Sequence, residues 1–190
     1  MSQLLSIRTY GDPVLREPSR PVEAITPDIL ALIDAMYATM KASKGVGLAA
    51  QQVGRTEAVC VIEIPEDYDV EEDGSPRLNP DVPLRLALVN PRIVEASKKT
   101  CSLEEGCLSF PGITGNVQRA WSIVVEHLGL DGQPQTLKLK GFFARAAQHE
   151  MDHLAGDLFI DRFSHVKKLA VRSKLKHLQE DTLENLPVGH

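Results

Sequence analysis

Residues 148–153, with the sequence QHEMDH, constrain this chain more than any other feature of its sequence. On an α-helix, residues four apart leave the same face about one turn apart, so His149 and His153 can bind one metal ion together. Glu150 then lies beside the ion, where a carboxylate can take a proton from metal-bound water. The pattern therefore predicts a helix that supplies two ligands and a general base. A helix that carries two histidines by chance is the weaker alternative, because the glutamate occupies the position that catalysis needs.

The composition is that of an ordinary globular protein, and it excludes several functional classes. At 190 residues, 43% hydrophobic and 25% charged, the chain suits one domain over residues 1–190. A net charge of −5 argues against a surface that binds DNA as a whole, although it leaves a local basic patch open. Three cysteines without framework spacing argue against a disulfide-built secreted scaffold. The sequence has no basic and apolar leader and no long apolar run, so we expect a cytoplasmic protein that does not enter a membrane.

The apolar pattern predicts helices at the start, near the end and at the end of the chain. An N-terminal helix is expected from Thr26-Pro27 to about Ser43, since threonine caps helices and proline suits the first turn. The motif helix is expected over 142–154 with Gly156 ending it, and a last helix over 164–180, followed by a tail at 181–190.

Short strands are expected between the first two helices. The predicted segments are 57–64, 84–89 (stopped by Asn90-Pro91), 93–94, 100–103, and a hairpin of 122–128 with 135–139 around Asp131-Gly132. Residues 65–83 carry seven acidic residues, one basic residue and four prolines, which indicates a mobile acidic surface loop. The fold class is therefore α+β, with short strands packed around a central metal-binding helix.

A catalytic site of this kind needs a third protein ligand, since three ligands leave one position open for water. Asp157, Asp161 and His165 follow the motif, but none has a convincing protease spacing. Cys107, in the turn-like segment 105–109, is the better candidate because a thiolate is a strong soft ligand.

At this point the chain resembles the peptide deformylases, metal enzymes that remove the formyl group from the N-terminal methionine of newly made proteins. Three motifs occur in the family's order: G-x-G-x-A-A-x-Q at 45–52, E-G-C-x-S at 105–109, and Q-H-E-x-D-H at 148–153. Residues 11–16 are also similar to the family's opening segment, and the resemblance spans about residues 5–162.

The resemblance implies one metal ion bound by Cys107, His149 and His153, with Glu150 activating metal-bound water. It implies iron(II) as the cofactor in the cell, with zinc, nickel or cobalt as working substitutes. The expected reaction is hydrolysis of N-formyl-methionyl peptides to formate and a free N-terminal methionine.

The resemblance also implies groups that bind the substrate. The side-chain amide of Gln52, which could otherwise be a simple helix-flanking polar group, and the backbone N–H of Leu108 are expected to form an oxyanion hole. The residues expected to contact the peptide or its methionine side chain are Gly45, Val46, Gly47, Leu103, Glu105, Gly106, Phe142 and Arg145.

Several alternatives remain open at this stage. Cys60 suits a small core position, and Cys101 is either a packing residue or a fourth ligand that closes the open position. The latter would make a non-catalytic metal-binding module, and a zinc endoprotease is the other rival. Thr114 falls where some bacterial members place an arginine, and the loop at 65–83 is longer than in compact members.

The last predicted helix carries an apolar stripe and a basic face. The stripe is Val166, Leu169, Val171, Leu175 and Leu178, and the basic residues are Lys167, Lys168, Arg172, Lys174 and Lys176. Such a face is either the solvated side of a docked helix or a contact for ribosomal RNA near the exit tunnel, where the resemblance places a C-terminal helix.

Overall fold

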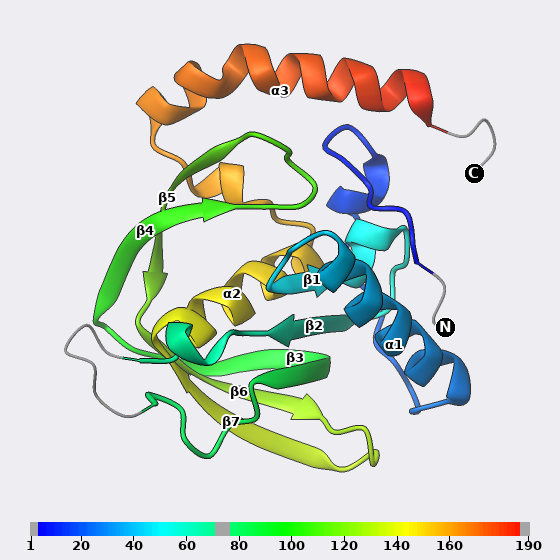
Figure 1. Cartoon of the computed structure of the whole chain (residues 1–190), viewed down its shortest axis with the longest axis vertical. Coiled ribbons are helices and arrows are strands. Elements are labelled where there is room, and N and C mark those ends of the chain that lie inside the picture. The colour runs from blue at the N-terminus through cyan, green and yellow to red at the C-terminus, as the bar shows by residue number, and fades with distance from the viewer. Residues whose placement is uncertain (1–3, 71–76, 187–190) are drawn as a thin grey trace.

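The computed structural model describes residues 4–70 and 77–186, which form two antiparallel sheets around one central helix (Figure 1). The helices are α1 (Pro27–Ala42), α2 (Gly141–Ala155) and α3 (His165–Asn185). The strands are β1 (Gly47–Ala49), β2 (Val59–Glu63), β3 (Arg85–Ala96), β4 (Thr100–Gly106), β5 (Thr114–Ala120), β6 (Ser122–Leu128) and β7 (Pro134–Lys140). Short 3-10 turns occur at Pro13–Arg16, Ala50–Val53, Glu66–Tyr68 and Phe159–Arg162. The predicted α+β class is confirmed, and no described helix is both long and apolar enough to cross a membrane.

The larger sheet, in the order β1-β2-β3-β6-β7, is covered by a helix on each face of β2. Val59 and Val61 pack in the cluster that contains α1, whereas Cys60 and Ile62 pack in the cluster that contains α2. Because successive strand residues point to opposite faces, a strand buried on both sides has to be apolar throughout. This explains the continuous hydrophobic run that predicts this strand, and it confirms Cys60 as a core residue.

One predicted strand end is wrong. The expected stop at Asn90-Pro91 lies inside β3, which continues to Ala96 with a shift of register between Val89 and Arg92. Asn90 has a positive φ of 50°, and its side chain accepts from the N–H of Val22 at 2.8 Å and donates to its carbonyl at 2.8 Å. Asn90-Pro91 therefore forms a bulge, which the two hydrogen bonds to Val22 stabilise, and the strand resumes beyond it.

The acidic segment 65–83 is less solvated than its composition indicates. Its described parts contain the turn Glu66–Tyr68 and three residues that are at most 7% exposed, Asp69, Asn79 and Val82. The other described residues of the segment are exposed or partly exposed, so it lies at the surface but is held there by these buried side chains; its middle, 71–76, lies outside the described residues.

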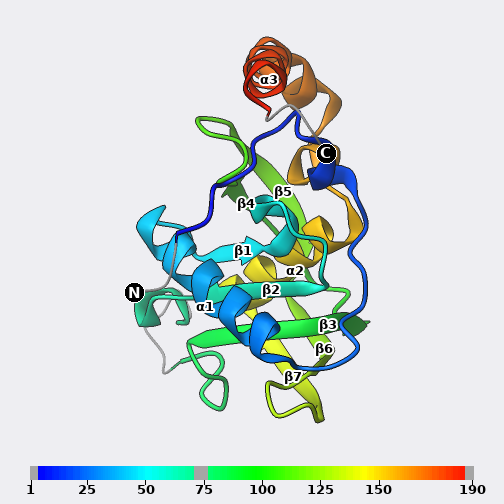
Figure 2. The same ribbon diagram turned by 90° about the vertical axis from the view of Figure 1, so that its right-hand side faces the viewer.

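The C-terminal helix is longer than predicted, and part of its apolar stripe faces solvent. α3 runs to Asn185, so the expected tail at 181 is wrong: Thr182 is buried, and its hydroxyl lies 2.7 Å from that of Thr9. Val171 is buried on the core, but Val166 and Leu169 are 77% and 55% exposed, which corrects the predicted stripe. The helix lies across the tip of the β4–β5 hairpin and the N-terminal segment (Figures 1 and 2).

Central helix α2 begins and ends where the sequence predicts, at the end of the β6–β7 hairpin and at Gly156. Gly156 has a φ of +80°, and a Cβ there would lie 2.6 Å from the carbonyl oxygen of Arg16. Only glycine adopts this conformation without strain and also lets the two backbones approach so closely.

We therefore expect Gly156→Ala to lower the free energy of unfolding by about 1–3 kcal/mol, as a strained and crowded backbone does. Gly132→Ala is the matched control, because its φ is +77° and nothing lies within 4 Å of the added Cβ. Urea unfolding of both variants separates conformational strain from the backbone clash. Equal losses of stability in the two variants would contradict the predicted clash.

Candidate metal centre

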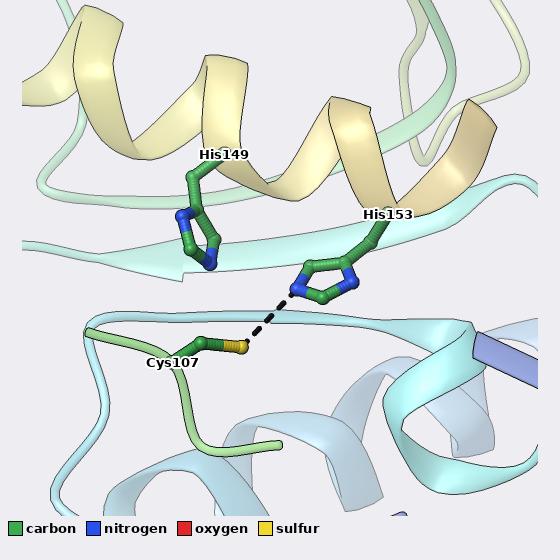
Figure 3. Close-up of side chains that lie close together, drawn as sticks. All are labelled: Cys107, His149 and His153. Atoms are coloured by element: carbon green, nitrogen blue, oxygen red, sulfur yellow. Dashed lines mark hydrogen bonds between the residues drawn. The ribbon is translucent and has the colours of Figure 1, made fainter. Parts of the chain in front are cut away.

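Helix α2 and the end of β4 bring three metal-ligating side chains together (Figure 3). One ligand atom from each of Cys107, His149 and His153 lies within 4.8 Å of the others, and Cys107 Sγ is 3.3 Å from His153 Nε2. Both histidines leave the same face of the helix, as residues four apart must, and the thiol approaches them from the segment that follows β4. The three predicted ligands are thus assembled.

The carboxylate of Glu105 fixes the orientation of the first histidine. Its Oε2 lies 3.0 Å from His149 Nδ1, which leaves Nε2 facing the other ligands. Two arginines hold this carboxylate: Arg119 donates twice at 2.9 Å, and Arg145 donates at 2.6 Å. Although burial raises the pKa of Glu105, the hydrogen bonds from Arg119 and His149 outweigh it and leave that pKa below its usual range. Arg119 was not predicted as a site residue, because nothing in the local sequence pattern points to it.

Glu150, the predicted base, is buried beside the ligands, and the absence of a side chain at Gly47 leaves space for its carboxylate. Burial raises its pKa to about 7, against the opposing effect of His149 and Arg119. A Cβ on Gly47 would lie 2.2 Å from Glu150 Oε1, so the first motif needs glycine there to admit the carboxylate. Glu150 Oε2 is buried with no hydrogen-bond partner among the described residues. A carboxylate of this pKa can accept and return a proton near neutral pH.

Gln52 places its amide nitrogen at the same site. Its Oε1 accepts from the N–H of Ala49 at 2.8 Å, which directs Nε2 toward Cys107 Sγ at 3.4 Å and Ser109 Oγ at 3.3 Å. The side chain is 1% exposed and belongs to the turn after β1. The Nε2 donor of Gln52 therefore faces the ligand cluster, a position that a simple helix-flanking polar group would not need.

The donor set fits a divalent transition metal. One thiolate and two imidazoles are borderline-soft ligands, and three protein ligands leave a position open. Burial is the largest effect on His153 and lowers its pKa, which favours the neutral imidazole that a metal ligand requires. Within the described residues, Cys101 is not part of this group and lines a neighbouring cavity, which removes the support for a closed four-ligand shell.

A cavity of about 450 Å³ is lined by Cys107 and His149, two of the three ligands, and by most of the predicted substrate contacts. The seven that line it are Gly45, Val46, Gly47, Glu105, Gly106, Phe142 and Arg145. Leu103 is 48% exposed and instead lines a second cavity, which shares Phe142 and Arg145 with the metal-site cavity. Ala146 and Ile113 also line the metal-site cavity and were not predicted.

Comparison with known proteins shows which family has this site. The model of the polypeptide deformylases matches residues 4–169. The chain belongs to the polypeptide deformylase family. It is 42% identical to a peptide deformylase of Brachyspira hyodysenteriae over 93% of this chain and 90% of that one. It is 44% identical to one of Halothermothrix orenii over 84% of this chain and 93% of that one.

Solved deformylase structures have the same fold. The Plasmodium falciparum enzyme superposes with a TM-score of 0.82 at 35% identity, covering 95% of this chain and 99% of that one. The Ehrlichia chaffeensis enzyme in complex with actinonin gives a TM-score of 0.79 at 37% identity, with coverage of 93% and 98%. The chain is accordingly a metallohydrolase with peptide deformylase activity, which removes the N-formyl group from nascent peptides.

Because Glu105 orients a metal ligand, we expect Glu105→Gln to weaken metal binding about 10- to 100-fold. The amide keeps the size of the side chain but leaves two buried guanidinium groups without their shared negative charge. The measurement is competition with a chelator at fixed pH. Glu104→Gln is the control, since the side chain of Glu104 is exposed and accepts a hydrogen bond only from Thr114 among the described residues. Unchanged affinity in Glu105→Gln would rule out the orienting role.

Proposed function

We propose specific roles for the residues of this site in deformylation. Cys107, His149 and His153 hold the metal, and Glu150 serves as the general base. The assembly of the three donors within 4.8 Å beside a buried, unpartnered carboxylate oxygen is the observation that carries this proposal. When bound, the metal ion would act as a Lewis acid that lowers the pKa of a water molecule and polarises the formyl carbonyl.

We propose iron(II) as the ion in the cell. Cysteine and histidine ligands also accept zinc, nickel and cobalt, so the donor set supports a divalent metal without selecting one. The family resemblance is what favours iron.

The base moves one proton in each direction. Glu150 takes a proton from the attacking water, helped by its pKa of about 7, and returns it to the nitrogen that leaves as the free amine. Formate is the other product. The buried position of the carboxylate keeps bulk water from competing for this proton.

Two donors stabilise the oxyanion that develops on the formyl oxygen. Gln52 Nε2 faces the ligand cluster, and the N–H of Leu108 donates no hydrogen bond to any residue that the structure describes. Hydrogen bonds from such donors strengthen as negative charge develops on the formyl oxygen. The loss of one donor typically costs about 2.7–4 kcal/mol of transition-state stabilisation.

The peptide binds as an added strand between two free sheet edges. β1 is an outer strand of the larger sheet, and β4 pairs only with β5 within the described chain. Gly45-Val46-Gly47 and Glu105-Gly106 border the cavity between these edges, where backbone groups can pair with an extended peptide. The methionine side chain then fills the apolar part of the cavity near Val46 and Phe142.

We predict that Glu150→Gln retains metal but releases formate at least about 100-fold more slowly, because the amide cannot accept a proton. Metal content and formate release are measured on anaerobically purified protein, which also identifies the ion. Cys107→Ala should lose tight metal binding, whereas Cys60→Ala, at a core position, should keep it. Near-normal turnover of Glu150→Gln would remove the general-base role, and cleavage of unformylated internal bonds would favour an endoprotease.

We further propose that the enzyme works in the cytoplasm and meets its substrate at the ribosome through α3. Arg172, Lys174 and Lys176 are exposed on this helix, while Val171 and Thr182 attach it to the body of the protein. A positive face on an otherwise acidic chain supports contact with RNA phosphates.

Binding through these residues should weaken steeply as salt rises, because each phosphate contact releases counterions. We expect Arg172→Glu with Lys174→Glu to abolish ribosome co-sedimentation at low salt and to leave hydrolysis of free formyl peptides unchanged. Charge reversal is preferred to removal of α3, since Val171 belongs to the core. Equal co-sedimentation of the variant and the wild type would show that the helix only packs.

A further inference from the structure

The metal-site cavity shares a wall with a second cavity. The metal-site cavity of about 450 Å³ and a second cavity of about 520 Å³ share Phe142 and Arg145 as lining residues. The two wall residues are held differently. Arg145 donates to Glu105, to the carbonyl of Val117 at 2.9 Å and to the carbonyl of Cys101 at 2.5 Å, whereas the ring of Phe142 has no polar group to anchor it. The position of Phe142 therefore depends on the groups that pack behind it.

Tyr68 packs behind this ring. The centroids of Tyr68 and Phe142 lie 5.2 Å apart, with the rings at 77°, an edge-to-face contact. Tyr68 comes from the acidic segment, is 51% exposed and lines the second cavity. Without its ring, the second cavity offers space into which Phe142 can turn, and the metal-site cavity then widens.

A buried polar cluster fixes the segment that carries Tyr68; we call Asp69, Arg77 and Asn79 the Asp69 clamp. Asp69 is 1% exposed, and its carboxylate accepts from Arg77 Nε at 2.9 Å and from Asn79 Nδ2. Arg77 also donates to the carbonyl of Val82 at 2.7 Å. A buried carboxylate is tolerated only when it is paired in this way, so the clamp has one favoured arrangement.

The clamp is attached to the start of α2, next to Phe142. Asn79 accepts from the N–H of Lys140 at 2.9 Å and donates to its carbonyl at 3.2 Å. Leu78 lies on Gly141, since a Cβ at that glycine would meet Leu78 Cδ1 at 2.7 Å. The acidic segment and the wall of the metal-site cavity are therefore fixed relative to each other at adjoining residues.

We propose that Tyr68, held by the Asp69 clamp, is a specificity-determining positioning residue that keeps Phe142 in place and so limits the size of the first side chain of the substrate. The proposal rests on the proposed function, because it assigns that side chain to the metal-site cavity. Tyr68 acts through Phe142 and has no part in the chemical step.

The test compares formyl-methionyl and formyl-phenylalanyl peptides with the metal-loaded full-length protein. We expect Tyr68→Ala to raise the ratio of kcat/KM for formyl-phenylalanyl over formyl-methionyl peptide by about tenfold, mainly through a lower KM for the larger residue. Tyr68→Phe keeps the ring, and the ratio should stay at the wild-type value. Asn79→Ala, which frees the clamp from α2, should shift the ratio in the same direction as Tyr68→Ala.

The outcomes are separable. An unchanged ratio in Tyr68→Ala, or an equal fall in activity toward both peptides, would overturn the proposal and leave Tyr68 as a surface packing residue. A shift in Tyr68→Phe as large as that in Tyr68→Ala would also overturn it, since the ring would not be the cause. Absence of formate release by the wild-type enzyme from both peptides would instead contradict the deformylation on which the proposal rests.

Discussion

The buried carboxylate of Glu105 is the interaction on which the site depends. It binds Arg119, Arg145 and His149 at once, and these residues belong to β5 and α2, while Glu105 belongs to β4. Arg119 continues the network to Asp152, which also binds Arg162 beyond the motif helix. A carboxylate placed out of water between two arginines requires all of its partners, so the small sheet cannot shift against α2 without breaking several charged hydrogen bonds. The same network therefore holds the small sheet on α2 and orients the metal ligand His149.

The ligands of the site were predictable from the sequence because they belong to short motifs of neighbouring residues. The i, i+4 histidines, the thiol in its motif and the glycine that ends α2 all lie where expected. The buried strand at 59–63 was predictable for a similar reason, since burial on both faces demands an unbroken apolar run.

The features that sequence reasoning missed depend on contacts between distant residues. Asn90 looks like a strand end, yet its side chain pairs with Val22, 68 positions away, and the strand continues past it. The acidic segment reads as solvated by composition, but Asn79 pairs with Lys140 and draws the segment onto α2. Arg119 and the burial of Thr182 likewise depend on partners that no local pattern reveals.

The short length of β1 limits how many residues of a substrate can form backbone hydrogen bonds with this strand. This outer strand has only three residues, Gly47–Ala49. Since alternate residues of a strand direct their backbone groups to the same side, in the proposed binding mode the β1 edge can pair with only the first one or two residues of an incoming chain. Backbone pairing with β1 therefore depends on where the incoming chain begins and hardly on the side chains beyond that point.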